Sequence, residues 1–372
     1  MSTPPAHSYD AKNLPDAVQA LGWQDAARAA HFANWLSALS PTHGLAPLSV
    51  RAASADASFR RYFRIDAGTR TMVIMDAPPD KENNQAFVDK AGLFEQAGVH
   101  VPKVLNWDQT HGFLLLEDLG SHTLMQSLDR LSDRERLHWF DQATDILCQW
   151  QQSSREGVLP AYDAPTLHQE LMLFPTWYVR QYKNLTLSAR DADQLQNLFD
   201  TLVAFNLAAP KVFVHRDFMP RNLMMPSPDA PQVLGVLDFQ DALHGPITYD
   251  IASLMRDAFV SWDEDFCLDI TVRYWEKARQ AGLMDFEDWH SDFGSFYRAV
   301  EWMGLQRHLK VAGIFARLTL RDGKPQYLAD TPRFIGYMRA TATRYRELFP
   351  LLKLLDHIEG TQNRFGYAFG RS

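Results

Sequence analysis

One stretch of the sequence decides the fold: HRDFMPRN at residues 215–222, followed further along the chain by LDFQD at residues 237–241. Both lie among short apolar runs that are typical of β-strands, at 212–214, 223–225 and 233–239. Loops at strand ends are where a rigid scaffold usually presents functional side chains. The sequence therefore predicts a functional site that includes Asp217, Asn222 and Asp238.

These three side chains carry the oxygen atoms that phosphoryl transfer requires. That reaction needs a carboxylate to orient the acceptor hydroxyl and take its proton, and oxygen ligands for the Mg²⁺ ions that bridge the phosphates. We expect Asp217 to be the base, and Asn222 and Asp238 to be the metal ligands. His215 is expected to make structural hydrogen bonds rather than to donate a proton, and Asp241 either binds metal or caps a turn.

The composition excludes several classes of protein. The chain has 372 residues, 46% of them apolar and 22% charged, with 19 Gly and 20 Pro, which excludes collagenous and disordered chains. A chain of this length usually forms two domains or lobes. The net charge of −8 disfavours a general electrostatic hold on nucleic acid or anionic lipid. Cys148 and Cys267 lie in apolar, helix-like stretches and are expected to be buried free thiols in a reducing compartment.

The pattern of elements changes along the chain from strands to helices. A helix is expected at 15–39, closed by Pro41, and then a small antiparallel sheet that includes 59–65 and 71–75. A helix at 85–97 and apolar runs at 99–107 and 113–116 follow. Ser132 and Glu135 fit a capping box that begins a helix. Further helices are expected at 188–208, 262–282, 291–320 and 331–356. We find neither a signal peptide nor an apolar run that could cross a membrane, so we expect a soluble cytoplasmic protein.

With these motifs, the chain resembles the protein-kinase-like superfamily and, within it, the aminoglycoside and choline phosphotransferases. Residues 215–222 match the catalytic loop, Asp238 the metal aspartate, 114–120 the hinge and 249–252 a structural turn. The resemblance implies a bilobal α+β fold with ATP and Mg²⁺ as cofactors. A β-rich N-lobe with an extra helix and a nucleotide-covering sheet would span 1–120, and a mostly helical C-lobe with the acceptor pocket would span 121–372. The backbone at Glu117 and Leu119 would receive adenine, and Asp250 would tie the catalytic loop in place.

Four longer phrases resemble the bacterial N-acetylmuramate/N-acetylglucosamine anomeric kinases of peptidoglycan recycling. They are SADASFRRYFR at 54–64, VIMDAPP at 73–79, GVLDFQDALHGPITYDIASLMRD at 235–257 and QRHLKVAGIFARL at 306–318. This implies transfer of the ATP γ-phosphate to the C1 hydroxyl of a small amino sugar, with no nucleic acid, membrane or obligate protein partner. The alternatives are a kinase of another small alcohol such as an aminoglycoside or choline, a pseudokinase that only binds nucleotide, and a metal-dependent hydrolase.

Two departures from the kinase pattern concern the nucleotide phosphates. The glycine-rich loop is replaced by residues 54–58, which contain no glycine, so the Ser58 hydroxyl is the candidate contact. The strand at 73–76 carries no lysine. Arg61 or Arg64 is the candidate replacement, and Arg60 competes with them.

The acceptor pocket is the hardest part to locate. Glu170, Trp177 and Tyr178 lie in a segment, 168–182, that is rich in the aromatic and carboxylate side chains that grip sugars. With 10 Trp, 12 Tyr and 23 Phe in the chain, core packing is the competing interpretation. Arg307, with His308 and Lys310, either meets the lactyl carboxylate of a muramyl substrate or belongs to a solvated basic stripe on an exposed helix.

Overall fold

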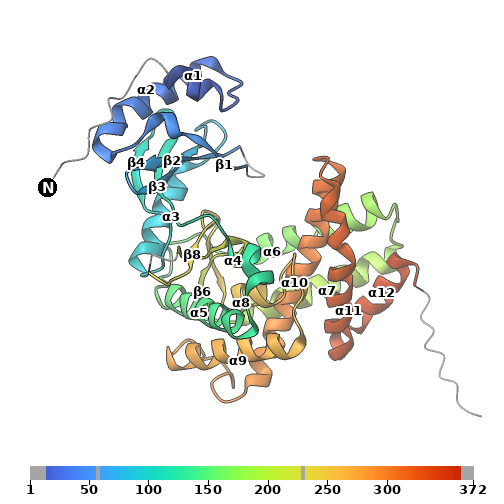
Figure 1. Ribbon diagram of the computed structural model, residues 1–372. Helices are drawn as coiled ribbons and strands as arrows, with labels where there is room; N and C mark the ends of the chain where they lie inside the picture. The colour runs from blue at the N-terminus through green and yellow to red at the C-terminus, as the bar shows by residue number, and fades with distance from the viewer. Residues whose placement is uncertain (1–13, 56–58, 228–230, 362–372) are drawn as a thin grey trace, which may run out of the picture. The chain divides into compact units, whose positions relative to one another are not determined.

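The computed structural model describes residues 14–55, 59–227 and 231–361. The chain divides into two compact units (Figure 1). The first unit comprises Met1–Ser127 and Leu223–Gln240, and the second comprises Leu128–Asn222 and Asp241–Ser372. The first unit holds a five-stranded sheet with its own helices and the second is mostly helical, so the expected α+β class is confirmed.

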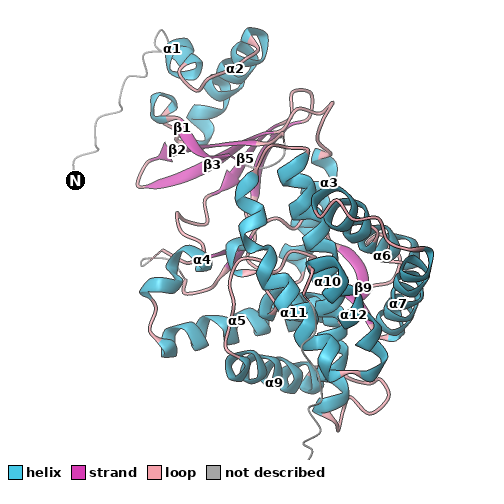
Figure 2. Cartoon of the chain, turned by 90° about the vertical axis from the view of Figure 1, so that its right-hand side faces the viewer, coloured by secondary structure: helices cyan, strands magenta, loops and turns pink. Residues whose placement is uncertain are grey.

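The first unit contains a five-stranded antiparallel sheet with the strand order β1-β2-β3-β5-β4. Its strands are β1 (Arg51–Ala55), β2 (Arg61–Ala67), β3 (Arg70–Asp76), β4 (Val104–Asp108) and β5 (Phe113–Glu117). Alternate residues of β2 are buried, as expected for a strand with one face on a core. Phe63, Ile65 and Ile74 of the sheet share that core with Phe32 and Leu36 of helix α2 (Ala26–His43). Helices α1 and α2 lie over one face of the sheet (Figure 2).

The single N-terminal helix expected from the sequence is wrong. Two helices form, α1 (Leu14–Gln19) and α2, because Gly22 adopts a left-handed φ of 73° and Asp25 caps α2 by accepting from the Ala27 N–H at 2.8 Å. Pro41 does not end α2, since it lies in the last turn. Gly44, at φ 63°, ends the helix in the left-handed conformation that glycine adopts without strain.

Helix α3 (Asn84–Gln96) supports the segment that contains Asp238. Phe87 and Phe94 of α3 pack on Phe239, with ring centroids 5.0 and 5.4 Å apart. Lys90 donates a hydrogen bond to the Gln240 carbonyl. The segment follows a short hairpin, β7 (Leu223–Met224) and β8 (Gly235–Val236). The apolar run at 233–239 therefore forms a strand over only two residues.

The second unit is built around helix α10 (Phe293–Leu320), which is buried along most of its length. It packs against the π-helix η4 (Phe174–Tyr182), α8 (Thr248–Met255) and α11 (Thr331–Arg344). Strands β6 (Lys211–Val214) and β9 (Leu243–Pro246) pair antiparallel, and β9 was not expected from the sequence. The other helices of the chain are α4 (Leu124–Ser127), α5 (Asp133–Gln152), α6 (Ala164–Leu171), α7 (Ala189–Ala208), α9 (Glu264–Gln280) and α12 (Phe349–Glu359), with short 3₁₀ turns at Pro47–Ser49, Leu128–Arg130, Pro220–Asn222, Pro325–Asp330 and Arg346–Leu348.

The predicted helix starts in this unit are mostly right. The capping box of Ser132 and Glu135 is present in full, and Ser188 caps α7. The helix expected at 331–356 is wrong, because the extended backbone of Tyr345 ends α11 and a second helix begins at Phe349.

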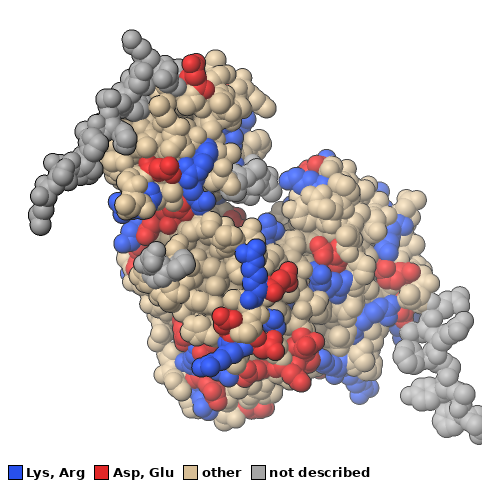
Figure 3. All heavy atoms as spheres, viewed as in Figure 1, with Lys and Arg blue, Asp and Glu red and all other residues tan. Residues whose placement is uncertain are grey.

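Acidic and basic side chains are interspersed over the surface of this unit on the face shown (Figure 3). Cys148 and Cys267 are buried free thiols, as expected. Among the described residues, no helix is both long enough and apolar enough to span a membrane.

Candidate active site

The loop after β6 is held in place by one buried carboxylate. Asp250 on α8 accepts hydrogen bonds from the backbone N–H groups of His215, at 2.7 Å, and Arg216, at 2.9 Å. Arg216 has a φ of 80°, a conformation that costs a non-glycine residue roughly 1–3 kcal/mol and persists only where the surroundings enforce it. Burial raises the pKa of Asp250, although His215 and the two backbone donors oppose this. Asp250 therefore fixes the turn that presents Asp217.

Two further hydrogen bonds order the loop around Asp217. The Asp217 N–H donates to Nδ1 of His215 at 3.2 Å, and His215 is fully buried. The Asn222 amide Nδ2 donates to the Asp217 carbonyl at 2.8 Å. Asn222 lies at the end of the 3₁₀ turn and is buried. Since an amide nitrogen can only donate, the second bond fixes which end of the Asn222 side chain is oxygen.

Asp217 is partly exposed and carries a negative charge. Burial would raise the pKa of its carboxyl, but the positive charges of Lys310, Arg307 and Arg216 outweigh burial and hold the pKa below its ordinary value. Asp217 is therefore a carboxylate at neutral pH, and three cationic side chains act on it.

Glu170 on α6 is buried and pairs directly with two of these cations, Arg216 and Lys310. Its Oε1 atom accepts from Arg216 Nη2 at 2.7 Å and pairs with Lys310 Nζ at 2.9 Å. Its Oε2 atom accepts from the Tyr162 hydroxyl. Arg307 donates to the Arg216 carbonyl at 2.7 Å, so it holds the backbone of the loop after β6 directly. Burial would raise the pKa of Glu170, but Lys310 and Arg216 more than offset it and lower that pKa.

The interpretation of Arg307, His308 and Lys310 as a solvated stripe is wrong. These residues are only 3%, 2% and 8% exposed, because α10 is covered by other helices of its unit. His308 Nε2 donates to the Arg256 carbonyl, 3.2 Å away, and burial lowers the pKa of His308 to about 3. His308 is therefore neutral and contributes no charge to the loop.

Trp177 and Tyr178 lie in the π-helix with different neighbours from those of Glu170. Tyr178 is buried, stacks on Phe174 at 5.3 Å and donates to Glu359 on α12 at 2.7 Å. Trp177 is half-buried.

In the first unit, Asp238 is exposed and lies in the segment after β8. Its φ of 64° is left-handed, and its Oδ1 atom accepts from Gln240 Nε2 at 2.7 Å. The next side chain, Phe239, is fully buried against α3. The strained conformation is thus held by the packing of its neighbour. Asp241, the remaining acidic residue of this stretch, is exposed and begins the next part of the second unit.

The arginines of β2 both have carboxylate partners. Arg61 bonds to Asp76 at 2.9 and 2.7 Å and lies 3.8 Å above the Trp23 ring. Arg64 bonds to Asp118 at 2.6 and 3.0 Å. The competing Arg60 is buried and pairs with Glu82 at 3.1 Å. Sequence reasoning missed the carboxylates Asp76 and Asp118, although Asp76 stands in VIMDAPP and Asp118 in the expected hinge. Ser58 lies outside the described residues.

The expected hinge, 114–120, overlaps strand β5 and continues beyond its end at Glu117. The Glu117 N–H donates to the Lys103 carbonyl at 2.9 Å, so this backbone donor is already engaged. Leu119 lies against Gly235, where a Cβ atom would approach it to 2.6 Å. A larger residue at position 235 would therefore require the Leu119 side chain to shift.

The fold and the loop chemistry define a class of phosphate-transferring enzymes. Within the described part of the chain, no group of three or more His, Cys, Asp or Glu side chains is arranged to hold a metal ion. The family model "Phosphotransferase enzyme family" matches residues 49–291. The chain belongs to this family and is a phosphotransferase.

Two curated relatives make the family more specific. The chain is 49% identical over 312 residues to the N-acetylmuramate/N-acetylglucosamine kinase of Pseudomonas aeruginosa, covering 83% of this chain and 88% of that protein. It is 46% identical over 339 residues to the protein of the same name from Neisseria meningitidis serogroup B, covering 90% and 98%. The resemblance seen in the sequence is thereby confirmed.

The fold is shared with solved kinases. The choline kinase LicA from Streptococcus pneumoniae matches with a TM-score of 0.55 at 13% identity, covering 83% of this chain and 98% of that chain. This likeness confirms the protein-kinase-like fold expected from the sequence.

Proposed function

We propose that this protein transfers the γ-phosphate of ATP to the anomeric C1 hydroxyl of N-acetylmuramate or N-acetylglucosamine, as a step of peptidoglycan recycling. The relatives of 46–49% identity and the four sequence phrases support this acceptor. The observation that carries the chemistry is the charged Asp217, held on an enforced turn among Arg216, Arg307 and Lys310.

In this proposal Asp217 accepts a hydrogen bond from the C1 hydroxyl and takes its proton as the new bond to phosphorus forms. A carboxylate with a lowered pKa is a weak base, so its main contribution is to align the hydroxyl oxygen for in-line attack. An anomeric hydroxyl suits a weak base, because the ring oxygen makes it more acidic than the other sugar hydroxyls. His215 and Asp250 keep the loop in shape and do not touch the reacting atoms.

The donor chemistry of the loop fits Mg²⁺. Asn222 and Asp238 supply an amide and a carboxylate oxygen, which are hard ligands of the kind that Mg²⁺ takes. Because Asn222 Nδ2 is engaged by the Asp217 carbonyl, its oxygen is the atom presented as a ligand. In chain order, Asn222 directly precedes β7 and Asp238 follows shortly after β8. When bound, Mg²⁺ would draw charge from the phosphates of ATP.

We propose roles in nucleotide and acceptor binding for the remaining expected residues. Residues 1–120 would carry the nucleotide-covering sheet and 121–372 the acceptor pocket. Ser58, Arg61 and Arg64 are the proposed phosphate contacts, where each arginine would share its guanidinium between a carboxylate and a phosphate oxygen. The backbone near Glu117 and Leu119 would receive adenine.

On the acceptor side, the contacts of four residues support different roles for them. Glu170 and Arg307 act on Asp217 through other side chains and the backbone of Arg216, so we assign them positioning roles. Trp177, which is half-buried, is the better candidate for stacking on a sugar face. Tyr178 is directed to Glu359.

Product analysis by phosphorus NMR tests the proposal. The protein is incubated with Mg-ATP and, separately, N-acetylmuramate, N-acetylglucosamine, choline or an aminoglycoside. We expect a sugar phosphate whose phosphorus couples to the anomeric proton, and no such product with Asp217→Asn. A product only with choline or the aminoglycoside would replace the proposed acceptor. Binding of Mg-ATP in a thermal-shift assay, without turnover of any acceptor, would assign a pseudokinase instead.

A further inference from the structure

Arg221 is an exposed cation in the same loop as Asp217. It lies in the 3₁₀ turn Pro220–Asn222, directly before Asn222. The Asn222 amide donates to the Asp217 carbonyl at 2.8 Å, and the Asn222 N–H donates to the Met219 carbonyl at 2.8 Å. These two bonds fold the loop back on itself, so the backbone of Arg221 is held close to that of Asp217.

The Arg221 guanidinium is supported by an aromatic ring of the same unit. Its Cζ atom lies 4.7 Å from the centroid of the Phe259 ring. Phe259 follows α8, where Asp257 Oδ1 accepts hydrogen bonds from the backbone N–H groups of Phe259 and Val260, the second at 2.9 Å. Asp257 thus fixes the turn that carries the ring. Because the face of an aromatic ring attracts a cation, the ring restricts the positions that the guanidinium takes.

Arg221 has no anionic partner at hydrogen-bond distance. Among the described residues it makes neither a hydrogen bond nor an ion pair. Asp257 attracts it electrostatically, but Asp257 is fully buried and its Oδ1 atom is engaged by the backbone. Arg216, in the same loop, differs in that it pairs with Glu170 at 2.7 Å. The N–H donors of the Arg221 guanidinium are therefore available to a ligand.

The basic residue expected to meet a substrate carboxylate is not accessible. Arg307 was the sequence candidate for the lactyl carboxylate of a muramyl sugar, but it is 3% exposed and donates to the Arg216 carbonyl at 2.7 Å. Lys310 is also buried and pairs with Glu170 at 2.9 Å. A guanidinium binds a carboxylate through two parallel N–H···O bonds only where the carboxylate can reach it. The exposed Arg221 meets this condition.

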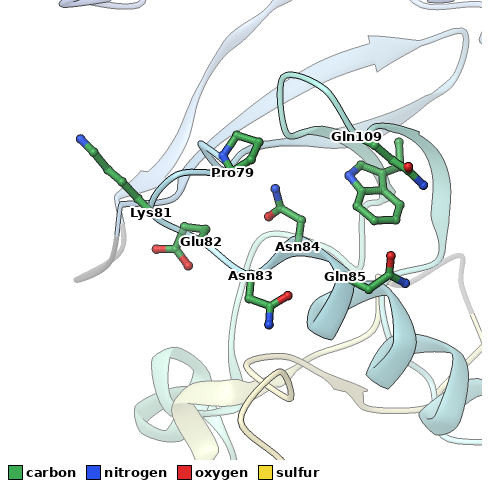
Figure 4. Close-up of a pocket in the computed structure, with 8 residues that line it drawn as sticks. Pro79, Lys81, Glu82, Asn83, Asn84, Gln85 and Gln109 are labelled. Atoms are coloured by element: carbon green, nitrogen blue, oxygen red, sulfur yellow. The ribbon is translucent and has the colours of Figure 1, made fainter.

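The open pocket at the start of α3, in the first unit, is a poorer match for an anion. Its volume is about 470 Å³, and its lining combines Lys81 with the carboxylate of Glu82. Lys81 Nζ lies 4.8 Å from the centroid of the Phe59 ring, and Figure 4 shows this ammonium group directed away from the other labelled residues. An anionic ligand in this pocket would therefore meet the charge of Glu82 without a facing cation.

We propose that Arg221 binds the lactyl carboxylate of N-acetylmuramate and so determines how strongly this acceptor is favoured over N-acetylglucosamine. This inference rests on the proposed function. The two sugars share the C1 hydroxyl and the acetamido group and differ at C3, where N-acetylmuramate carries the lactyl ether. With the C1 hydroxyl at Asp217, the lactyl group extends towards the cation of the same loop. Phe259 is a positioning residue, because it acts through the guanidinium of Arg221.

The test compares kcat/KM for N-acetylmuramate with kcat/KM for N-acetylglucosamine, using the full-length protein and saturating Mg-ATP. Arg221→Gln should lower the ratio of the two values at least about tenfold, because a charged hydrogen-bonded pair is lost. Arg221→Lys should keep part of the ratio, and Phe259→Leu should lower it less than Arg221→Gln does. Arg279→Gln is the matched control and should leave the ratio unchanged, because Arg279 also lies over an aromatic ring, 4.6 Å from Trp275, but on α9.

The methyl ester of N-acetylmuramate isolates the charge of the carboxylate. Binding of the free acid and of the ester is measured by titration calorimetry, which does not depend on turnover. The wild-type protein should bind the acid at least about tenfold more tightly than the ester, and Arg221→Gln should bind the two equally. The wild-type comparison needs no variant, so it stands even where a substitution impairs folding.

The outcomes separate this contact from the reaction. An unchanged ratio in Arg221→Gln, or equal binding of acid and ester by the wild-type protein, would overturn the contact whether or not a sugar phosphate forms. An equal loss with both acceptors, together with a raised KM for ATP, would overturn it and assign Arg221 to the nucleotide phosphates. Tighter binding of the acid that is lost in Arg221→Gln, in a protein that phosphorylates neither sugar, would support the contact and refute the reaction.

Discussion

Replacing Glu170 with glutamine should destabilise the second unit more than any exposed substitution would. Glu170→Gln keeps the shape of the side chain but removes its negative charge. The two cations that this carboxylate balances, Arg216 and Lys310, then lose their direct ion-pair partner and keep only the attraction of Asp217. The side chain of Lys310 is 10% exposed and that of Arg216 is 22% exposed, so neither can easily be solvated.

The expected size of the effect follows from this burial. Breaking a buried ion pair by removing one partner typically costs about 3–5 kcal/mol. For a unit of this size, about 1 kcal/mol corresponds to roughly 2–4 °C in melting temperature. We therefore expect Glu170→Gln to lower the melting temperature of the second unit by about 6–20 °C at neutral pH.

A double-mutant cycle and a matched control isolate the cause. Lys310→Met alone should also destabilise, but the double variant Glu170→Gln/Lys310→Met should lose less than the two single losses added together, by about 0.5–3 kcal/mol. Glu301→Gln is the control, because Glu301 is an equally buried carboxylate on α10 that pairs with Arg344. The Arg344 side chain is 40% exposed and can turn to water, so this loss should be smaller.

The pH dependence gives a second, independent check. The pKa of Glu170 is lowered in the folded protein from an ordinary value of 4.5, so its contribution is present above that pH and is lost as the pH falls through the folded-state pKa. The difference in melting temperature between wild type and Glu170→Gln should therefore be largest at neutral pH and should disappear on acidification. Additive losses in the cycle, or a gap that does not change with pH, would refute the reasoning that charge compensation holds this cluster.

Three further predictions concern single side chains. Asp217→Asn should fold with a wild-type melting curve but lose about 10²–10⁴ in turnover, and unchanged turnover would contradict its assigned role. Burial raises the pKa of Asp257 to about 6, so this group costs stability as the pH rises from about 4 to 6. The melting temperature of Asp257→Asn relative to wild type should rise over that pH range, and a difference that stays constant would show that Asp257 does not titrate there. Gly112→Ala should lower the melting temperature of the first unit more than Gly68→Ala does, since both have positive φ but only the Gly112 site lacks room for a Cβ atom; equal losses would leave backbone conformation as the whole effect.

The parts of the structure that depend on local sequence could be predicted. Capping residues such as Ser132 and Ser188 act within one helical turn, so their pattern alone locates the starts of α5 and α7. The stretch at 215–222 could be singled out as a candidate site because its residue types and spacing match the requirements of phosphoryl transfer. The break at Gly22 was missed, because a single glycine can interrupt an otherwise periodic helical pattern. The passage of α2 through Pro41 was also missed, because a proline near a helix end disrupts few of the helix's hydrogen bonds.

The parts that depend on distant contacts could not be predicted. The polar residues Arg307 and Lys310 look like a solvated stripe in the sequence, since nothing near them indicates that helices cover α10 on several sides. Their partner Glu170 lies on α6, far away in the chain, and the Tyr162 hydroxyl completes the set. Likewise, no local signal pairs Arg61 with Asp76 or Arg64 with Asp118. Ion pairs across a fold become visible only when the elements are assembled.

The buried cluster also explains how a partly buried carboxylate can stay charged in this loop. Burial alone would favour the neutral acid, which cannot accept the proton of an acceptor hydroxyl. Arg216, Arg307 and Lys310 reverse that preference at Asp217, but these three cations also repel one another, and Asp217 alone balances only one of their charges. Glu170 supplies a second anion from a different helix, so the charge of the loop after β6 and the packing of α6 against α10 depend on each other.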